Sequence, residues 1–107
     1  MAYTKRLGHL FEQAFGDYLL HTAQPSITTV VRDIVVWNAD AQPADFHVYL
    51  SSPGVGGRYA LLDLLALPSN QSGHEEMRQV VLEGEEIRLD TNSPLFSALV
   101  TGYQLVD

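Results

Sequence analysis

The stretch that decides the fold is Ala44-Asp45-Phe46-His47-Val48-Tyr49-Leu50-Ser51, in which apolar and polar residues alternate. Successive side chains of a strand point to opposite sides, so Phe46, Val48 and Leu50 share one face of an extended chain. The polar face carries Asp45, His47, Tyr49 and Ser51. The pattern predicts a half-buried strand whose apolar face lies on a protein core.

The residues before this strand also favour extended chain. Residues 26–37 are dense in β-branched and aromatic types, and residues 38–43 contain the Asn, Asp and Pro that suit a turn. Together with residues 44–51 they predict a hairpin with a longer loop. Residues 51–57 are rich in Gly and Pro and predict a loop, without the glycine order of a phosphate-binding motif.

The later part of the chain continues the strand pattern. Residues 58–67 suit either a helix or a strand buried on both sides. Residues 74–82 and 85–90 flank Glu83-Gly84 and predict a second hairpin. Residues 95–106 predict a last strand, in which Gly102 marks a bulge or a close approach of backbones.

The N-terminal residues leave two alternatives open. Apolar residues at helical spacing predict a short helix within residues 1–15, whereas residues 17–22 favour a strand. The helical spacing involves Leu7, Leu10, Phe11, Ala14 and Phe15. Residues 1–15 are therefore expected to be either a short helix or an extended arm.

The spacing of turns predicts an all-β fold, a single antiparallel β-sandwich of the jelly-roll or immunoglobulin-like kind with about seven or eight strands. There is no room for the helical crossovers of a parallel sheet, and residues 1–107 are expected to form one domain. The predicted core consists of Val31, Val35, Phe46, Val48, Leu50, Leu82, Ile87, Leu89 and Val100.

Composition excludes several classes of partner. Six basic residues against thirteen acidic ones give a formal charge of −7, which disfavours direct contact with nucleic acid or an anionic membrane. The chain has no cysteine, which excludes disulfides and thiolate zinc sites. No secretory signal and no apolar run of ~20 residues is present, so we expect a protein made in a cytoplasm, without a membrane span.

Candidate catalytic groups do not form a recognisable site. The four histidines lack the His-Glu-x-x-His spacing of a metal site, the acidic residues are mostly sequence neighbours, and no serine lies in a Gly-x-Ser-x-Gly motif. We therefore predict no enzyme activity, no cofactor, no metal site and no small-molecule substrate. A site built from distant strands, such as His21 with His47, is kept as an alternative.

The informative anomaly is an excess of apolar residues. Residues 34–37 are apolar on both faces of a strand, and residues 61–67 and 98–100 repeat this pattern, so a second cover is needed. That cover is either a loop or the N-terminal segment, with Trp37 as plain core, or a neighbouring subunit. The residues predicted to form a subunit interface are Ile34, Val36, Trp37, Leu61, Leu65 and Tyr103.

Several segments together resemble the small β-sandwich accessory proteins of tailed-bacteriophage virions. The segments are Lys5-Arg6-Leu7-Gly8, Asp17-Tyr18-Leu19-Leu20, residues 29–38, residues 44–50, residues 81–89 and Val100-Thr101-Gly102-Tyr103-Gln104-Leu105. The resemblance implies a strand at residues 58–67 and a virion protein of the tail, neck or capsid, assembled in the host cytoplasm. Its implied partners are further copies of the chain and other virion proteins.

A second hypothesis is a small recognition module. Loops carried on a rigid sandwich often bind ligands, so residues 51–57 and 68–74 are candidates for binding a glycan or a host surface molecule. Sugar binding favours aromatic side chains in the loops, yet Trp37 falls in a strand and Tyr59 alone lies next to a loop. The virion protein is therefore the leading hypothesis.

Overall fold

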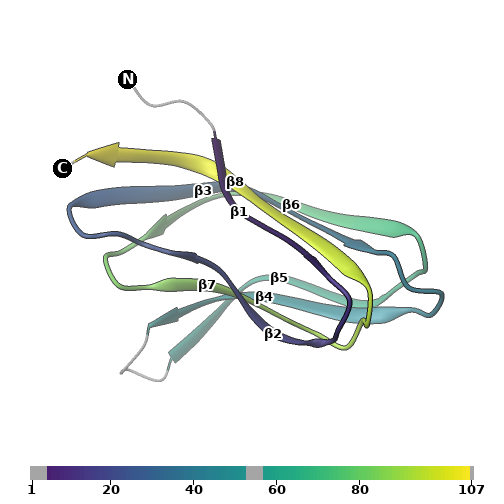
Figure 1. The fold of residues 1–107 in the computed structure, drawn as a ribbon. Helices are drawn as coiled ribbons and strands as arrows, with labels where there is room; N and C mark the ends of the chain where they lie inside the picture. The colour runs from purple at the N-terminus through teal and green to yellow at the C-terminus, as the bar shows by residue number, and fades with distance from the viewer. Residues whose placement is uncertain (1–4, 53–56, 107) are drawn as a thin grey trace.

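The computed structural model describes residues 5–52 and 57–106, and within these residues every regular element is a β-strand (Figure 1). The fold is an all-β sandwich, as the alternating apolar pattern predicted. The eight strands are β1 (Lys5–Glu12), β2 (Gly16–Thr22), β3 (Ile27–Asn38), β4 (Ala44–Ser52), β5 (Gly57–Leu67), β6 (Gln71–Val81), β7 (Glu86–Thr91) and β8 (Phe96–Val106).

The strands form two four-stranded antiparallel sheets, in the orders β1-β8-β3-β6 and β2-β7-β4-β5. The two sheets are stacked face to face, with β1 above β2 at one side and β6 above β5 at the other (Figure 1). Successive strands cross from one sheet to the other except at β4 and β5, which pair as a hairpin. This connectivity is that of a jelly roll, which decides between the two kinds of sandwich predicted.

Both hairpins predicted from the sequence are wrong. β3 and β4 lie in opposite sheets, and so do β6 and β7. The turn residues between them are present, but a turn sequence does not state whether the next strand returns beside the last one or crosses the core. In this chain each of these two connections crosses the core.

Residues 5–12 of the N-terminal segment form strand β1, so the helix alternative is wrong for the described part of this segment. β1 pairs with β8, and its register shifts between Arg6 and Gly8. This bulge turns Leu7 toward the core, where Leu10 also packs. Two inward residues therefore stand three positions apart, which imitates the spacing of a helix. Residues 58–67 belong to strand β5, as the resemblance implied.

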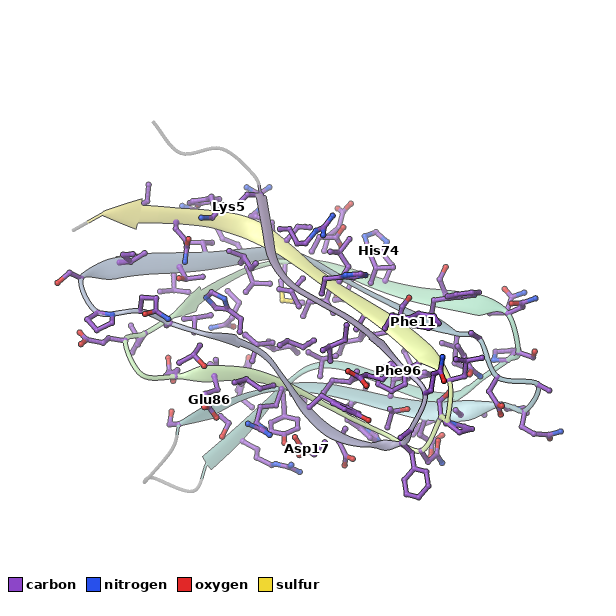
Figure 2. All side chains as sticks on the ribbon, viewed as in Figure 1. Lys5, Phe11, Asp17, His74, Glu86 and Phe96 are labelled. Carbon is purple, nitrogen blue, oxygen red and sulfur yellow. The ribbon has the colours of Figure 1, made fainter. Side chains whose placement is uncertain are left out.

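The core lies between the sheets, and its centre is aromatic. Phe96, labelled in Figure 2, is fully buried there and contacts Phe46 and Tyr18, with ring centroids 5.9 Å and 5.5 Å away. Leu50 packs against this cluster while partly exposed. The fully buried residues predicted correctly are Val31, Phe46, Val48, Ile87, Leu89 and Val100.

Two residues that were predicted to lie in the core lie outside it. Val35 faces away from the core, because its neighbours Ile34 and Val36 take the two inward positions. Leu82 follows the end of β6 and is 64% exposed, so strand alternation does not apply to it.

A buried polar cluster joins the two sheets at one end of the sandwich. The side chain of Asn38, at the end of β3, is fully buried. Its amide donates to the carbonyl oxygens of Leu67 at 2.9 Å and Gln42 at 2.8 Å. Its Oδ1 accepts from the Ser93 hydroxyl at 2.9 Å and from the backbone N–H of Asp40 at 3.2 Å. Asn38 thus fixes the ends of β3 and β5 and the β7–β8 connection together.

Candidate interaction surfaces

The outer side of the β1-β8-β3-β6 sheet, here called the upper face, carries apolar side chains among polar ones. Alternation along β3 sends Ile34 and Val36 into the core and leaves Val35 and Trp37 pointing outward. The apolar side chains of the upper face are Phe11, Val30, Val35, Trp37, Val80, Leu99, Tyr103 and Leu105.

The register places these side chains in rows across the sheet. Val35 lies opposite Leu99, and Trp37 lies two residues further along β3, at 37% exposed. Val30 is flanked by Tyr103 on one side and Val80 on the other, and only 4% of it is exposed although it faces outward. Neighbouring apolar side chains therefore cover one another only in part, and the rest of this face meets solvent.

The residues predicted as an interface are divided by the structure. Ile34 and Val36 are fully buried in the core, and Leu61 packs against the core at a bulge between β4 and β5. Trp37 and Tyr103 share the upper face. Leu65 is 74% exposed on β5, an edge strand of the other sheet.

Other exposed apolar residues were missed by the sequence analysis. Phe11, Phe15 and Leu19 lie on or between β1 and β2, and Val80 lies on β6. All of these positions are on edge strands or next to them. Because the sequence does not state which strands are edges, alternation alone could not single them out.

The upper face also carries a pair of titratable groups. The Nε2 atom of His74 on β6 lies 2.7 Å from Asp33 Oδ1 on β3, and Glu76 lies 3.8 Å from the same nitrogen (Figure 2 labels His74). Arg6 and Glu76 stand at opposite edges of this sheet. The charged groups therefore lie among the apolar side chains of the upper face.

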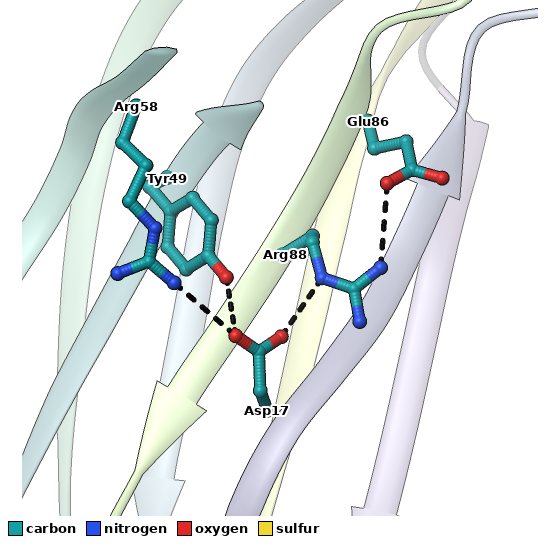
Figure 3. A network of polar contacts seen from close by, with 5 residues as sticks. All are labelled: Asp17, Tyr49, Arg58, Glu86 and Arg88. Atoms are coloured by element: carbon teal, nitrogen blue, oxygen red, sulfur yellow. Dashed lines mark hydrogen bonds and ion pairs between the residues drawn. The ribbon is translucent and has the colours of Figure 1, made fainter. Parts of the chain in front are cut away.

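The outer face of the β2-β7-β4-β5 sheet has a different character, because a polar network crosses all four strands (Figure 3). Asp17 of β2 lies at its centre. Its Oδ1 accepts a hydrogen bond from Arg88 Nε at 2.8 Å, and its Oδ2 accepts from the Tyr49 hydroxyl and from Arg58 Nη2 at 3.3 Å. Arg88 also donates to Glu86 Oε1 at 3.3 Å.

This network links the four strands of the sheet to one another. The Arg58 guanidinium stacks on the Tyr49 ring, 3.8 Å from its centroid. Burial and the Asp17 hydrogen bond raise the pKa of Tyr49, and the hydrogen bond to Asp17 raises the pKa of Arg88. Both oxygens of Asp17 are occupied by donors and both perturbed groups keep their usual protonation at neutral pH. The arrangement therefore joins the four strands of the sheet through the carboxylate of Asp17.

The histidines kept as an alternative metal site do not form one. His21 Nδ1 donates to the carbonyl oxygen of Leu7 at 3.2 Å, and burial lowers the pKa of His21. His47 Nδ1 lies 2.8 Å from Asp63 Oδ1. Across residues 5–52 and 57–106 there is no group of three or more potential metal ligands. The same residues contain no helix long and apolar enough to cross a membrane.

The loops of the recognition hypothesis are only partly described. Residues 53–56 of the loop at 51–57 lie outside the described residues. Residues 68–70 form a turn, and Gln71 already belongs to β6. Tyr59, beside the first loop, is exposed on β5.

Comparison with known proteins identifies neighbours in fold. No protein-family model matches the chain, and no curated protein matches it in sequence. Among solved structures, a chain of the acidic stable capsid of Helicobacter pylori bacteriophage KHP30 is 12% identical, with a TM-score of 0.59; the match covers 98% of this chain and 94% of that one.

Two further neighbours are a phage protein and an insect protein. A pentameric capsid protein from metagenomic phage sequences is 14% identical over 94% of this chain and 63% of its own, with a TM-score of 0.50. The nucleoplasmin-like N-terminal domain of Drosophila FKBP39 is 17% identical over 100% and 91%, with a TM-score of 0.52. At these identities the likeness concerns the fold: a jelly roll of the kind found in viral capsids and in nucleoplasmin-like domains.

Proposed function

We propose that this chain is a non-enzymatic structural protein of a phage virion, which assembles as repeated copies and packs against other tail or capsid proteins. Residues 1–107 act as one β-sandwich unit in this assembly, which forms in the host cytoplasm and needs no cofactor, nucleic acid or membrane. Its place in the virion, at the tail, the neck or the capsid surface, is set by the virion proteins that bind it.

The observation that carries the proposal is the amount of apolar surface left outside the core. Val35, Trp37, Leu99 and Tyr103 share one face, and further large apolar residues lie on the edge strands. A small soluble domain with contiguous exposed apolar surface uses it for contact with other proteins. A phage capsid chain of nearly the same extent shares the fold, which supports a virion as the place of that contact.

Two properties of the sites support a structural role over catalysis. The Asp17 network uses its carboxylate oxygens to join strands, and His47 and His74 each lie beside a carboxylate on an open sheet surface. The hollow lined by His47 and the hollow lined by Asp33 and Glu76 are both open to solvent, whereas catalytic groups use an enclosed pocket to exclude water. The acidic surface, with a formal charge of −7, would repel the packaged genome.

Native mass spectrometry and light scattering on the purified chain test the proposal. We expect, at micromolar concentration, a complex whose mass is a whole multiple of 11.8 kDa. Antibodies against the chain should also label purified virions of a phage that encodes it. A strictly monomeric chain that is absent from such virions would contradict the proposed function.

A further inference from the structure

The two lateral sides of the sandwich both expose large apolar residues. We call them the β1/β2 flank and the β5/β6 flank, after the edge strands that form each one. The β1/β2 flank exposes Phe11, Phe15 and Leu19, and the β5/β6 flank exposes Tyr59, Leu65, Val80 and Leu82. Seven of the nine exposed large hydrophobic side chains in the described part of the chain lie on these two flanks. Phe11 and Val80 also lie at the edges of the upper face, so the uncovered apolar surface extends from that face onto both flanks.

In the β2-β7-β4-β5 sheet, the strand register places apolar residues of the two flanks at the same position along the strand direction, here called their height. One row of paired residues runs from β5 to β2 through Leu64, Phe46, Thr91 and Gly16. Leu65 follows this row on β5, and Phe15 precedes it on the β2 side. Because β5 and β2 run in opposite directions, Leu65 and Phe15 lie on the same side of the row. They stand at the same height on opposite flanks, and 74% and 69% of their surfaces are exposed.

A second row of the same sheet repeats the match. It runs through Ala60, Tyr49, Arg88 and Leu19. Leu19 is therefore level with Ala60, one residue from the exposed Tyr59. Each flank of this sheet thus carries two apolar side chains, and each has a counterpart at nearly the same height on the other flank.

The β1-β8-β3-β6 sheet adds a pair of opposite charges that lie at one height on the two flanks. A row of that sheet runs through Arg6, Thr101, Asp33 and Glu76. Arg6 and Glu76 are both exposed at its opposite edges and carry opposite charges. A flank that met a copy of itself across a two-fold axis parallel to the strands would place Arg6 near Arg6, whereas a flank that met the opposite flank at the same height would place Arg6 near Glu76.

From these matches we propose that the β1/β2 flank of one copy binds the β5/β6 flank of the next, head to tail, so that the chain forms a closed ring. This inference rests on the proposed self-association and names its surfaces. Rotation about an axis parallel to the strands keeps every residue at its height, so Phe15 meets Leu65, Leu19 meets Tyr59 and Arg6 meets Glu76. Repetition of such a heterologous contact closes into a ring when the rotation divides a full turn.

The dimensions of the flank are adequate for a stable contact. The sandwich measures 44 × 31 × 20 Å, and a flank extends along the strands and across the thickness of the two sheets. Standard interfaces bury about 800 Å² per partner, which such a flank can supply. The ring would cover the exposed edge strands, which are otherwise open to uncontrolled pairing. It would leave the upper face and Trp37 available to a different virion protein.

Two double variants test the arrangement, each disabling one flank. One carries Phe15→Glu and Leu19→Glu, and the other carries Tyr59→Glu and Leu65→Glu. Each variant alone should be a monomer, because each lacks one of the two surfaces that a head-to-tail contact requires. An equimolar mixture should give a 1:1 dimer, seen by native mass spectrometry, because one intact flank remains on each variant. All four positions are exposed, so both variants should keep the circular dichroism spectrum of the unmodified chain.

The control is Trp37→Glu, which places the same charge on the upper face and should leave the ring intact. The inference is wrong if Trp37→Glu splits the complex while both flank variants keep it, although the proposed self-association would then stand. It is also wrong if either flank variant alone still forms a dimer, because that result indicates a flank that binds its own kind. A monomeric unmodified chain would contradict both the ring and the proposed self-association.

Discussion

Gly102 illustrates how one small residue determines the local packing of this sheet. It lies on β8 opposite Val31, next to the point where the β3–β8 register shifts. A Cβ atom built on Gly102 would stand 2.0 Å from the carbonyl oxygen of Val30 and 3.0 Å from Leu7 Cδ1. The first of these neighbours is backbone, which cannot rotate away. The close approach predicted at Gly102 is therefore confirmed.

Gly102→Ala should destabilise the fold strongly, because the added methyl group forces β3 and β8 apart. Overpacking of this kind costs about 3 kcal/mol of the free energy of unfolding. Urea denaturation followed by circular dichroism measures the change. The matched control is Gly57→Ala, whose Cβ meets no atom within 4 Å and should be nearly neutral. Equal stability of the two variants would show that the strands can separate at Gly102 without cost.

At the scale of the element, Asn38 is the buried polar side chain that holds the end of β3 in place. Asn38→Ala removes both amide donors and leaves the carbonyl oxygens of Leu67 and Gln42 without them. Unsatisfied buried groups of this kind cost about 2–4 kcal/mol of the free energy of unfolding. Asn92→Ala is the control, because Asn92 is exposed and accepts one hydrogen bond, from the backbone N–H of Asp45. Urea titrations of both variants should show the larger loss for Asn38→Ala, and a smaller loss there would contradict the assigned role.

Strands could be predicted from the sequence far better than their pairing. The alternation of Phe46, Val48 and Leu50 identifies an inward face, and the structure confirms it. Turn residues 38–43 were interpreted as a hairpin, yet they carry the chain from one sheet to the other. Pairing depends on contacts between distant strands such as β1 and β8, and no local pattern records those contacts.

The candidate surfaces were predictable in kind but only partly in position. The apolar run at residues 34–37 predicts more apolar surface than one core can hold, and the structure places Val35 and Trp37 of this run outside the core. Ile34 and Val36 were predicted to be interface residues, but both point from β3 into the core. Val35 and Trp37 point outward instead. A shift of one residue exchanges the two faces of a strand. When a run is apolar on both faces, the sequence does not show which residues point inward, and only the structure decides it.

At the scale of the whole molecule, the jelly roll is built almost entirely from contacts between distant parts of the chain. β8 lies between β1 and β3, so the first sheet is complete only when residues 96–106 have joined residues 5–12. Within the described residues, β4 and β5 are the only consecutive strands that pair with each other. Loop closure must therefore precede most of the stabilising contacts, and it is entropically unfavourable.

This topology predicts slow folding for a chain of its size. Refolding after dilution from urea should take milliseconds to seconds, the range of proteins dominated by non-local strand pairing, and not microseconds. Stopped-flow fluorescence can follow it through Trp37, the single tryptophan, which lies on β3 between β8 and β6. The flank variant Phe15→Glu with Leu19→Glu isolates this step from assembly, because it should remain monomeric. If its refolding rate is independent of protein concentration and the unmodified chain shows an additional concentration-dependent phase, folding of the sandwich precedes association. Microsecond refolding of the variant would contradict the prediction, because closing the β1–β8 pair requires nearly the whole chain.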